Sequence, residues 1–165
     1  MAFNFEYYSP TQVVFGRDTQ QRVGSLVRQY GGSRVLVVYG GHSAVRSGLL
    51  AQVQQALEQE GLFQVALGGV VPNPRLDKVR EGIALGQAQG IDFLLGVGGG
   101  SVIDTAKAIA YGLAEPDKDV WDLYEHIRTA EKCLPVASVL TIAAAGSETS
   151  KSSVITNMEN GEKRG

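Results

Sequence analysis

Short apolar runs alternate along this chain with longer segments whose apolar residues recur every three or four positions. The runs Arg34–Tyr39 and Phe93–Val97 are typical of buried strands. Two further strands are predicted over Gln64–Leu67 and the apolar run Leu134–Ile142. Helical spacing predicts helices over Thr19–Tyr30, Gly48–Glu60, Arg75–Gln89 and about Val102–Gly112. Because parallel strands need helical crossovers, this order predicts an α/β fold with a doubly wound, mainly parallel, Rossmann-like sheet.

Both ends of the chain predict further strands. Aromatic and β-branched residues favour strands over Phe3–Tyr7 and Gln12–Phe15, and Lys151–Met158 has the same character. Asn160-Gly161 predicts a two-residue hairpin turn, after which only four residues follow. Since four residues make a poor second strand, we expect one domain over residues 1–165 that is cut from a longer protein.

Composition and charge exclude several classes of function. Hydrophobic residues make up 44% of the chain and charged residues 19%, as in ordinary globular proteins. A net charge of −2 without a basic stripe argues against a nucleic-acid partner. No apolar run approaches the ~20 residues of a membrane span, and the N-terminus does not resemble a secretory signal. A single cysteine, Cys133, fits a reducing compartment, so we expect a cytoplasmic protein.

The sequence GVGGGSVID, residues 96–104, has the order of strand, glycine turn and helix. Backbone N–H groups at such a helix N-terminus suit a phosphate, and Gly99, Gly100 and Ser101 would supply them. The alternative is a tight turn in which Ser101 only caps the helix, with Asp104 as its capping-box partner. On that interpretation Lys107 is a solvated surface charge. The spacing is not G-x-G-x-x-G, so the usual dinucleotide fingerprint does not apply.

The sequence YGGHS, residues 39–43, follows an earlier parallel strand. Rossmann-like sheets often place a carboxylate there, which binds the adenosine ribose and repels a 2′-phosphate. Here the positions hold Gly40 and Gly41, with His42, Ser43 and Arg46 close by. The absence of a carboxylate favours acceptance of NADPH, although a plain turn with a surface histidine explains the same residues.

Two further loops follow strands. In VVPNP the amide of Asn73 either reaches a ligand or caps the next helix. In LTIAAAGSETS small residues let a flat ligand approach, with Thr141, Ser147 and Glu148 as polar groups, or they merely allow loops to pack closely. The two histidines stand far apart and form no metal motif, and Cys133 is expected to be buried and inert.

Together these motifs resemble the iron-containing (group III) alcohol dehydrogenases, in the branch of butanol dehydrogenases and NADPH-dependent aldehyde reductases. The resemblance rests on YGGHS, GVVPNP, GVGGGSVIDTAKAIA, VLTIAAAGSE and NGEK, in family order and spacing over the whole chain. It implies a dehydroquinate synthase-like N-terminal domain that binds NAD(P). It also implies a helical metal-binding domain, absent here, which holds Fe²⁺ or Zn²⁺ through Asp-x-x-x-His and two later histidines. No catalytic or metal residue is therefore expected within this chain.

The resemblance implies cofactor contacts within each motif. Gly99, Gly100 and Ser101 match the pyrophosphate site, and Asp104 matches an aspartate near the nicotinamide side. Lys163 matches a lysine near the nicotinamide ribose. The remaining matches are Gly40, Gly41 and Ser43 at the adenosine ribose or its 2′-phosphate, Thr141 and Ile142 beside the adenine, and Asn73 and Ser150 as further cofactor contacts.

The activity implied is hydride transfer between NAD(P) and a primary alcohol or aldehyde, by a homo-oligomeric parent enzyme. One departure is Ala145, where the family usually has threonine. Losing a neutral hydrogen bond there would weaken cofactor binding by about 0.5–1.5 kcal/mol. Two alternatives stay open: a relative of glycerol dehydrogenase or dehydroquinate synthase, and a non-catalytic nucleotide-binding module.

Overall fold

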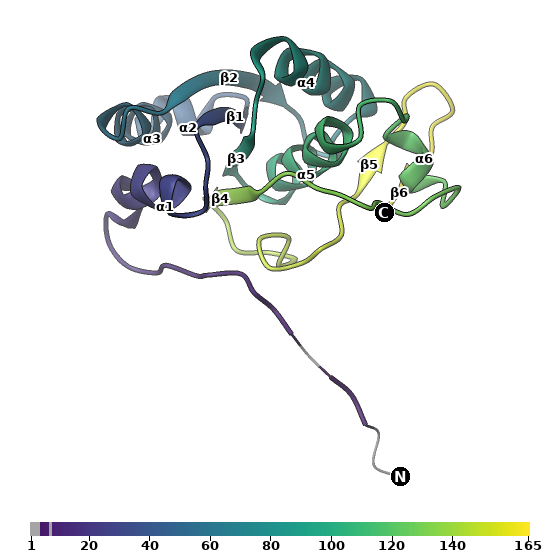
Figure 1. Ribbon diagram of the computed structural model, residues 1–165, viewed down its shortest axis with the longest axis horizontal. Helices are drawn as coiled ribbons and strands as arrows, with labels where there is room; N and C mark the ends of the chain where they lie inside the picture. The colour runs from purple at the N-terminus through teal and green to yellow at the C-terminus, as the bar shows by residue number, and fades with distance from the viewer. Residues whose placement is uncertain (1–3, 7) are drawn as a thin grey trace.

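A four-stranded parallel sheet forms the centre of the computed structural model, which describes residues 4–6 and 8–165. Its strands are β1 (Arg34–Gly40), β2 (Phe63–Val70), β3 (Phe93–Gly98) and β4 (Val136–Leu140). Their order across the sheet is β2-β1-β3-β4, and every neighbouring pair is parallel (Figure 1). The predicted parallel, doubly wound architecture is confirmed.

Helices cover both faces of this sheet (Figure 1). The 3-10 helix η1 (Thr19–Arg22), α1 (Val23–Gln29) and α3 (Leu49–Gln59) lie on one face. The long helices α4 (Leu76–Gln89) and α5 (Gly100–Ala114) cover the other face and pack against each other. Two short helices complete the set, α2 (Ser43–Arg46) and α6 (Trp121–Tyr124), and α6 lies in a segment expected to be irregular.

The central strands alternate their side chains between two apolar clusters. Leu36, Val38 and Leu94 point toward α4 and α5. Val35 and Val37 point to the opposite face, toward α1 and α3. A strand that is covered on both faces needs apolar residues at every position, which is why these strands read as continuous apolar runs.

The C-terminal segment forms a small antiparallel hairpin of β5 (Ile155–Thr156) and β6 (Lys163–Arg164). The predicted strand Lys151–Met158 is therefore wrong outside Ile155–Thr156. The N–H of Asn157 donates to the carbonyl of Glu162 at 2.8 Å, so the loop contains residues 158–161 rather than Asn160-Gly161 alone. The N–H of Thr156 donates to the carbonyl of Pro74 at 2.8 Å and fixes the hairpin beside the start of α4.

The strand predicted over Gln12–Phe15 is not formed. These residues have no regular structure, and Phe15 is 99% exposed. The segment that leads into η1 runs away from the body of the molecule (Figure 1). The strand predicted over Phe3–Tyr7 lies partly outside the described residues, and residues 4–6 show no strand. A two-stranded unit without a sheet to pack on has little stability, which accounts for the missing pair.

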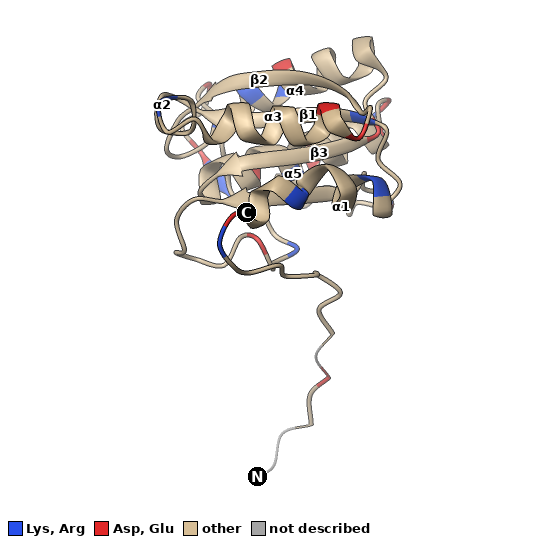
Figure 2. Cartoon of the chain, turned by 90° about the vertical axis from the view of Figure 1, so that its left-hand side faces the viewer, with Lys and Arg blue, Asp and Glu red and all other residues tan. Residues whose placement is uncertain are grey.

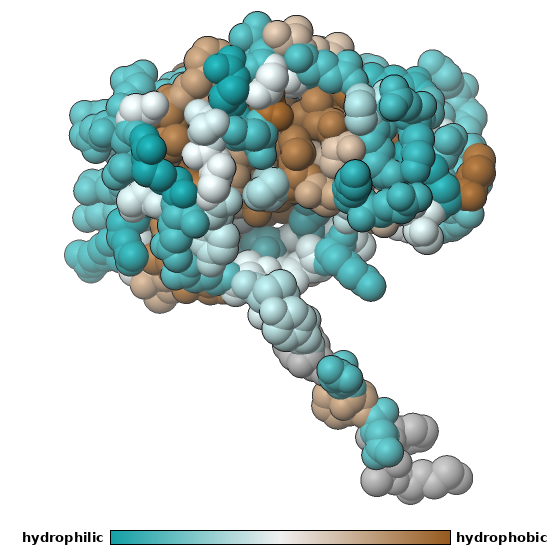
Figure 3. Space-filling model, in the orientation of Figure 1, coloured by the Kyte–Doolittle hydropathy of each residue, from teal (hydrophilic) through white to brown (hydrophobic). Residues whose placement is uncertain are grey.

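The surface carries charges of both signs without a continuous basic stripe on the face seen in Figure 2. In the view of Figure 3, apolar side chains gather in the middle of the face and hydrophilic ones border them. Among the helices of the described residues, none is long and apolar enough to cross a membrane.

Candidate functional site

The carboxyl ends of the strands gather the predicted site residues at one edge of the sheet. β1 ends at Gly40, β3 at Gly98 and β4 at Leu140. β1 and β3 are neighbours, but the chain continues from β1 to β2 on one side and from β3 to β4 on the other. Such a topological switch point opens the crevice in which parallel α/β proteins bind their ligands.

A glycine turn joins β3 to α5 at this switch point. Gly99 is the N-cap of α5, with extended backbone angles of φ −92° and ψ −168°. Among the described hydrogen bonds, the N–H groups of Gly100 and Ser101 have no acceptor. They lie at the positive end of the dipole of a 15-residue helix, where an anion is favoured.

The segment after β4 packs directly against this turn. The N–H of Thr141 donates to the carbonyl of Gly98 at 3.1 Å. A Cβ at Gly99 would lie 2.8 Å from Cγ2 of Ile142, and one at Gly100 would lie 3.3 Å from Oγ of Ser147. The turn and the start of the loop after β4 thus form one wall, and Ile142 is 63% exposed on it.

The capping-box interpretation of Ser101 and Asp104 is wrong. No side chain caps α5, and the carbonyl of Ser101 accepts a hydrogen bond from the hydroxyl of Thr105 at 2.8 Å. Asp104 is buried, and its Oδ2 accepts the N–H of Val154 at 3.1 Å. Its Oδ1 is buried without a partner in the part of the chain that the structure describes.

Lys107 is not the solvated surface charge that the alternative interpretation expects. It is 8% exposed, and its Nζ donates to the carbonyls of Ser147 at 2.5 Å, Ser150 at 2.6 Å and Ser152 at 2.9 Å. Burial lowers the pKa of Lys107, and the carboxylates of Asp104 and Glu148 oppose that shift. None of the sequence motifs assigns a binding role to Lys107. Its position one turn after Asp104 on an otherwise apolar helix was the available signal.

Asn73 and Lys163 meet although they are far apart in the sequence. Asn73 has a left-handed backbone with φ 56°, and its Oδ1 accepts a hydrogen bond from Nζ of Lys163 at 2.8 Å. The expected helix cap is wrong, because Arg75 is the N-cap of α4 and no side chain caps that helix. The C-terminal hairpin therefore delivers Lys163 to the loop after β2.

The loop after β1 lies next to the first turn of α5. A Cβ at Gly40 would lie 3.7 Å from Cγ2 of Val102 in the first turn of α5. Ser43 begins α2, whose N-cap is His42. A Cβ at Gly41 would meet nothing within 4 Å, so packing does not demand a glycine there.

Ser150 joins the site through Lys107, whose Nζ lies 3.3 Å from its hydroxyl. The structure thus brings the glycine turn together with Gly40, Thr141 and Ile142. It connects Asn73 with Lys163 as a separate pair, and it ties Ser150 to α5.

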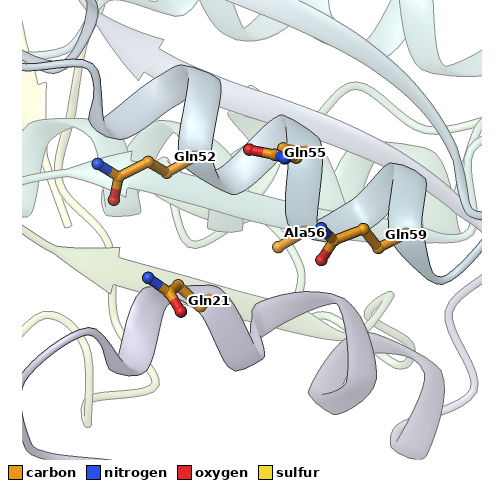
Figure 4. A pocket seen from close by; sticks show the side chains of 5 residues that line it. All are labelled: Gln21, Gln52, Gln55, Ala56 and Gln59. Carbon is orange, nitrogen blue, oxygen red and sulfur yellow. The ribbon is translucent and has the colours of Figure 1, made fainter.

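Within residues 4–6 and 8–165, no group of three or more His, Cys, Asp or Glu side chains is placed to hold a metal ion. Cys133 is exposed, not buried as expected. A cavity of about 240 Å³ lies between η1 and α3 (Figure 4). Its lining is Gln21, Gln52, Gln55, Ala56 and Gln59, none of which belongs to the candidate site.

Fold and site together define a doubly wound parallel α/β domain with a glycine turn and a free helix N-terminus at its switch point. The family model of iron-containing alcohol dehydrogenases matches residues 10–165. This chain belongs to that family, which confirms the resemblance.

Known relatives of this chain include butanol dehydrogenases and an aldehyde reductase of this family. The chain is 50% identical over 160 residues to the "Probable NADH-dependent butanol dehydrogenase 2" of Bacillus subtilis, covering 97% of this chain and 40% of the relative. It is 35% identical over 163 residues to the NADPH-dependent aldehyde reductase YqhD of Escherichia coli, covering 98% and 41%. The crystal structure of NADH-dependent butanol dehydrogenase A from Thermotoga maritima matches with a TM-score of 0.94 and 42% identity, covering 98% and 40%. The chain thus spans about 40% of the length of these relatives.

Proposed function

We propose that residues 1–165 form the NAD(P)-binding domain of a metal-dependent alcohol dehydrogenase or aldehyde reductase that acts on primary alcohols and aldehydes. The observation that carries the proposal is the glycine turn Gly98–Ser101, which presents free N–H groups at the start of α5 and at the switch point. Membership of the iron-containing alcohol dehydrogenase family supports it.

The residues present fit a dinucleotide. The amides of Gly100 and Ser101 would bind the pyrophosphate, and the absence of a Cβ at Gly99 keeps the turn against Ile142. Gly40, Gly41 and Ser43 would hold the adenosine ribose, with Thr141 and Ile142 beside the adenine. Asp104, Asn73, Ser150 and Lys163 would complete the contacts toward the nicotinamide.

The chemistry of the proposed reaction divides between two groups. A bound NAD(P) would supply or accept the hydride, and a metal held by residues other than those described would polarise the substrate oxygen. The part of the protein described here binds and orients the cofactor.

We propose that the site accepts NADPH as well as NADH, with NADPH slightly favoured. No carboxylate follows β1, so nothing in Gly40–Ser43 repels a 2′-phosphate. Relatives of both kinds exist, since the Bacillus subtilis protein is named NADH-dependent and the Escherichia coli protein NADPH-dependent. Titrating both reduced cofactors, followed by nicotinamide fluorescence, compares their dissociation constants directly.

Substitutions of Gly100 test the proposed pyrophosphate site. Gly100→Asp puts a negative charge beside the free amides and is expected to abolish cofactor binding. Gly100→Ala adds a Cβ at 3.3 Å from Oγ of Ser147 and should weaken binding only slightly, so it serves as the matched control. Thermal unfolding checks that both variants fold. Unchanged cofactor binding by a folded Gly100→Asp protein would rule out this site.

A non-catalytic nucleotide-binding module is the second candidate. Ala145, where the resemblance expects threonine, is the observation that favours it. The two functions separate by activity in the longer enzyme proposed above and not in residues 1–165, for which both predict cofactor binding without alcohol oxidation. Cofactor-dependent turnover by that longer enzyme, supplied with Fe²⁺ or Zn²⁺, would exclude the module.

A further inference from the structure

One face of α5 carries polar side chains that hold the segment Ser147–Val154, which has little regular structure. Asp104 accepts the N–H of Val154, and Lys107 donates to three carbonyls of the segment. One turn further along, the hydroxyl of Tyr111 donates to the carbonyl of Lys151 at 3.1 Å. Side chains of a helix therefore satisfy backbone groups that a neighbouring strand would otherwise pair.

The ammonium of Lys107 has as many N–H donors as there are carbonyl oxygens around it. An ammonium has three N–H donors and no acceptor, and here three carbonyl oxygens surround it, those of Ser147, Ser150 and Ser152. Their distances from Nζ are 2.5, 2.6 and 2.9 Å, so all three oxygens lie within hydrogen-bonding distance of the ammonium. The hydroxyl of Ser150 is a fourth, longer contact at 3.3 Å. A ring of carbonyls around a buried cation is the arrangement by which proteins bind metal cations.

This cage touches the glycine turn. Ser147 contributes one carbonyl to the cage. Its Oγ lies close to the glycine turn, 3.3 Å from the position that a Cβ at Gly100 would take. The position of the ammonium thus sets the position of the loop wall that faces the free amides of α5. A change at Lys107 would move this wall without touching the turn itself.

We propose that Lys107 is a positioning residue whose ammonium acts as a built-in cation, gathering the carbonyls of Ser147, Ser150 and Ser152 so that this segment forms one wall of the cofactor site. The consequence for cofactor binding rests on the proposed function. The ordering of the segment by the ammonium does not depend on it.

Chemical rescue tests the cation directly. Lys107→Ala removes the side chain beyond Cβ, and added propylammonium replaces the missing atoms, including the three N–H donors. In the purified protein we expect amide hydrogen exchange in residues 147–154 to accelerate and the dissociation constant for NADH and NADPH to rise about tenfold. Propylammonium should reverse both effects. Tetramethylammonium at equal ionic strength should reverse neither, because it has a charge but no N–H group.

Two further variants separate the charge from the packing. Lys107→Met keeps the length and apolar stem but leaves the carbonyls of Ser147 and Ser150 without donors, and that of Ser152 with the hydroxyl of Ser150 alone. It should therefore resemble Lys107→Ala in the absence of amine. Lys151→Ala removes an exposed lysine of the same segment and should behave like the unaltered protein. A Lys107→Met protein with normal exchange and normal cofactor binding would overturn the proposal.

The remaining outcomes are also decisive. Loss of folding in Lys107→Ala that propylammonium restores supports the built-in cation, whereas loss of folding that it cannot restore assigns Lys107 to general stability and overturns the proposal. If the unaltered protein binds neither cofactor but the segment still loosens and recovers with the amine, the proposed function fails and the positioning role stands.

Discussion

Ala145 offers a test of the cofactor site at the scale of one residue. It lies in the exposed stretch Ala143–Ala145, two residues before Ser147, and lacks the hydroxyl that the resemblance expects. Ala145→Thr should strengthen NAD(P)H binding by up to about tenfold, the value of one neutral hydrogen bond. Ala145→Val has the same shape without the hydroxyl and should leave affinity near that of the unaltered protein. Equal affinities of the two variants would place this position outside the cofactor site.

The contact between Asn73 and Lys163 allows a second prediction about cofactor binding. Their 2.8 Å hydrogen bond holds the loop after β2 to the C-terminal hairpin. We expect Lys163→Met and Asn73→Ala each to weaken cofactor binding, and the double variant to lose less than the sum of the two. Residues in contact show such coupling at about 0.5–3 kcal/mol. Strictly additive losses in a double-mutant cycle of dissociation constants would contradict a shared role.

Single residues also show where sequence reasoning ends. Gly99, Gly100 and Ser101 were predictable, because a glycine turn before an apolar helix determines its own local geometry. The partners of Asp104 and Lys107 were not, since they come from a segment about 40 to 50 residues further along the chain. Local signals allowed a helix cap for Asp104 and a surface charge for Lys107 as the alternative interpretation. Tertiary contacts with an irregular segment decided otherwise.

At the scale of elements, close contacts between helices depend on glycines. A Cβ at Gly24 in α1 would lie 2.1 Å from the backbone oxygen of Ala56 in α3. A Cβ at Gly82 in α4 would lie 2.3 Å from Cδ1 of Ile109 in α5, which is the far end of a flexible side chain. In an open helix Gly→Ala is stabilising by roughly 1 kcal/mol. Here we expect Gly24→Ala to destabilise by about 1–3 kcal/mol and Gly82→Ala by less, measured by denaturant unfolding.

Asp92 predicts a pH dependence at the same scale, because it joins the starts of β1 and β3. Its carboxylate accepts the N–H of Ser33 at 3.0 Å, the N–H of Arg34 at 2.8 Å and the hydroxyl of Ser33. Partial burial raises the pKa of Asp92, but these hydrogen bonds outweigh it and leave the pKa below its ordinary value.

A carboxyl with a lowered pKa in the folded state stabilises the fold above its unfolded pKa, and this contribution is lost as pH falls through the folded pKa. Asp92→Asn should therefore cost about 1–2 kcal/mol at pH 7 and progressively less below about pH 4. Unfolding free energies of both proteins between pH 3 and pH 7 measure the difference. A constant difference over this range would show that the charge of Asp92 does not matter.

The elements of the sheet were predictable because the central strands β1 and β3 are covered on both faces and the helices that pack on them carry regularly spaced apolar residues. The elements at the ends were not. Gln12–Phe15 and Lys151–Met158 have strand-forming residues, but a strand exists only where a partner supplies hydrogen bonds. For Ser147–Val154 the partners are side chains of α5, so the segment needs no ladder.

At the scale of the whole molecule, exposed apolar residues predict self-association. Phe5, Val13 and Phe15 near the N-terminus are 88%, 69% and 99% exposed, and Ile142 adds to the apolar surface beside the site. Burying these side chains against a second copy would remove apolar surface from water, which favours association. We expect the 165-residue chain to form dimers or larger species at micromolar concentration. A monodisperse monomer in light scattering would contradict this, and Phe15→Ser should shift the distribution toward monomer.

Cofactor binding and catalysis should separate in this chain. The glycine turn, Lys107 and the pair of Asn73 and Lys163 all lie within the 165 residues, which span about 40% of the length of the relatives. In the part of the chain described by the structure, no cluster of side chains is placed to hold a metal ion. We therefore expect this chain to quench or enhance nicotinamide fluorescence in a saturable titration, and to show no alcohol oxidation with NAD(P)⁺ after loading with Fe²⁺ or Zn²⁺. Two results would contradict this expectation. Turnover by the metal-loaded chain, abolished by a chelator, would show that the 165 residues contain a complete catalytic centre. If the chain shows no turnover and the nicotinamide fluorescence also does not change on titration, the cofactor site at the switch point is contradicted.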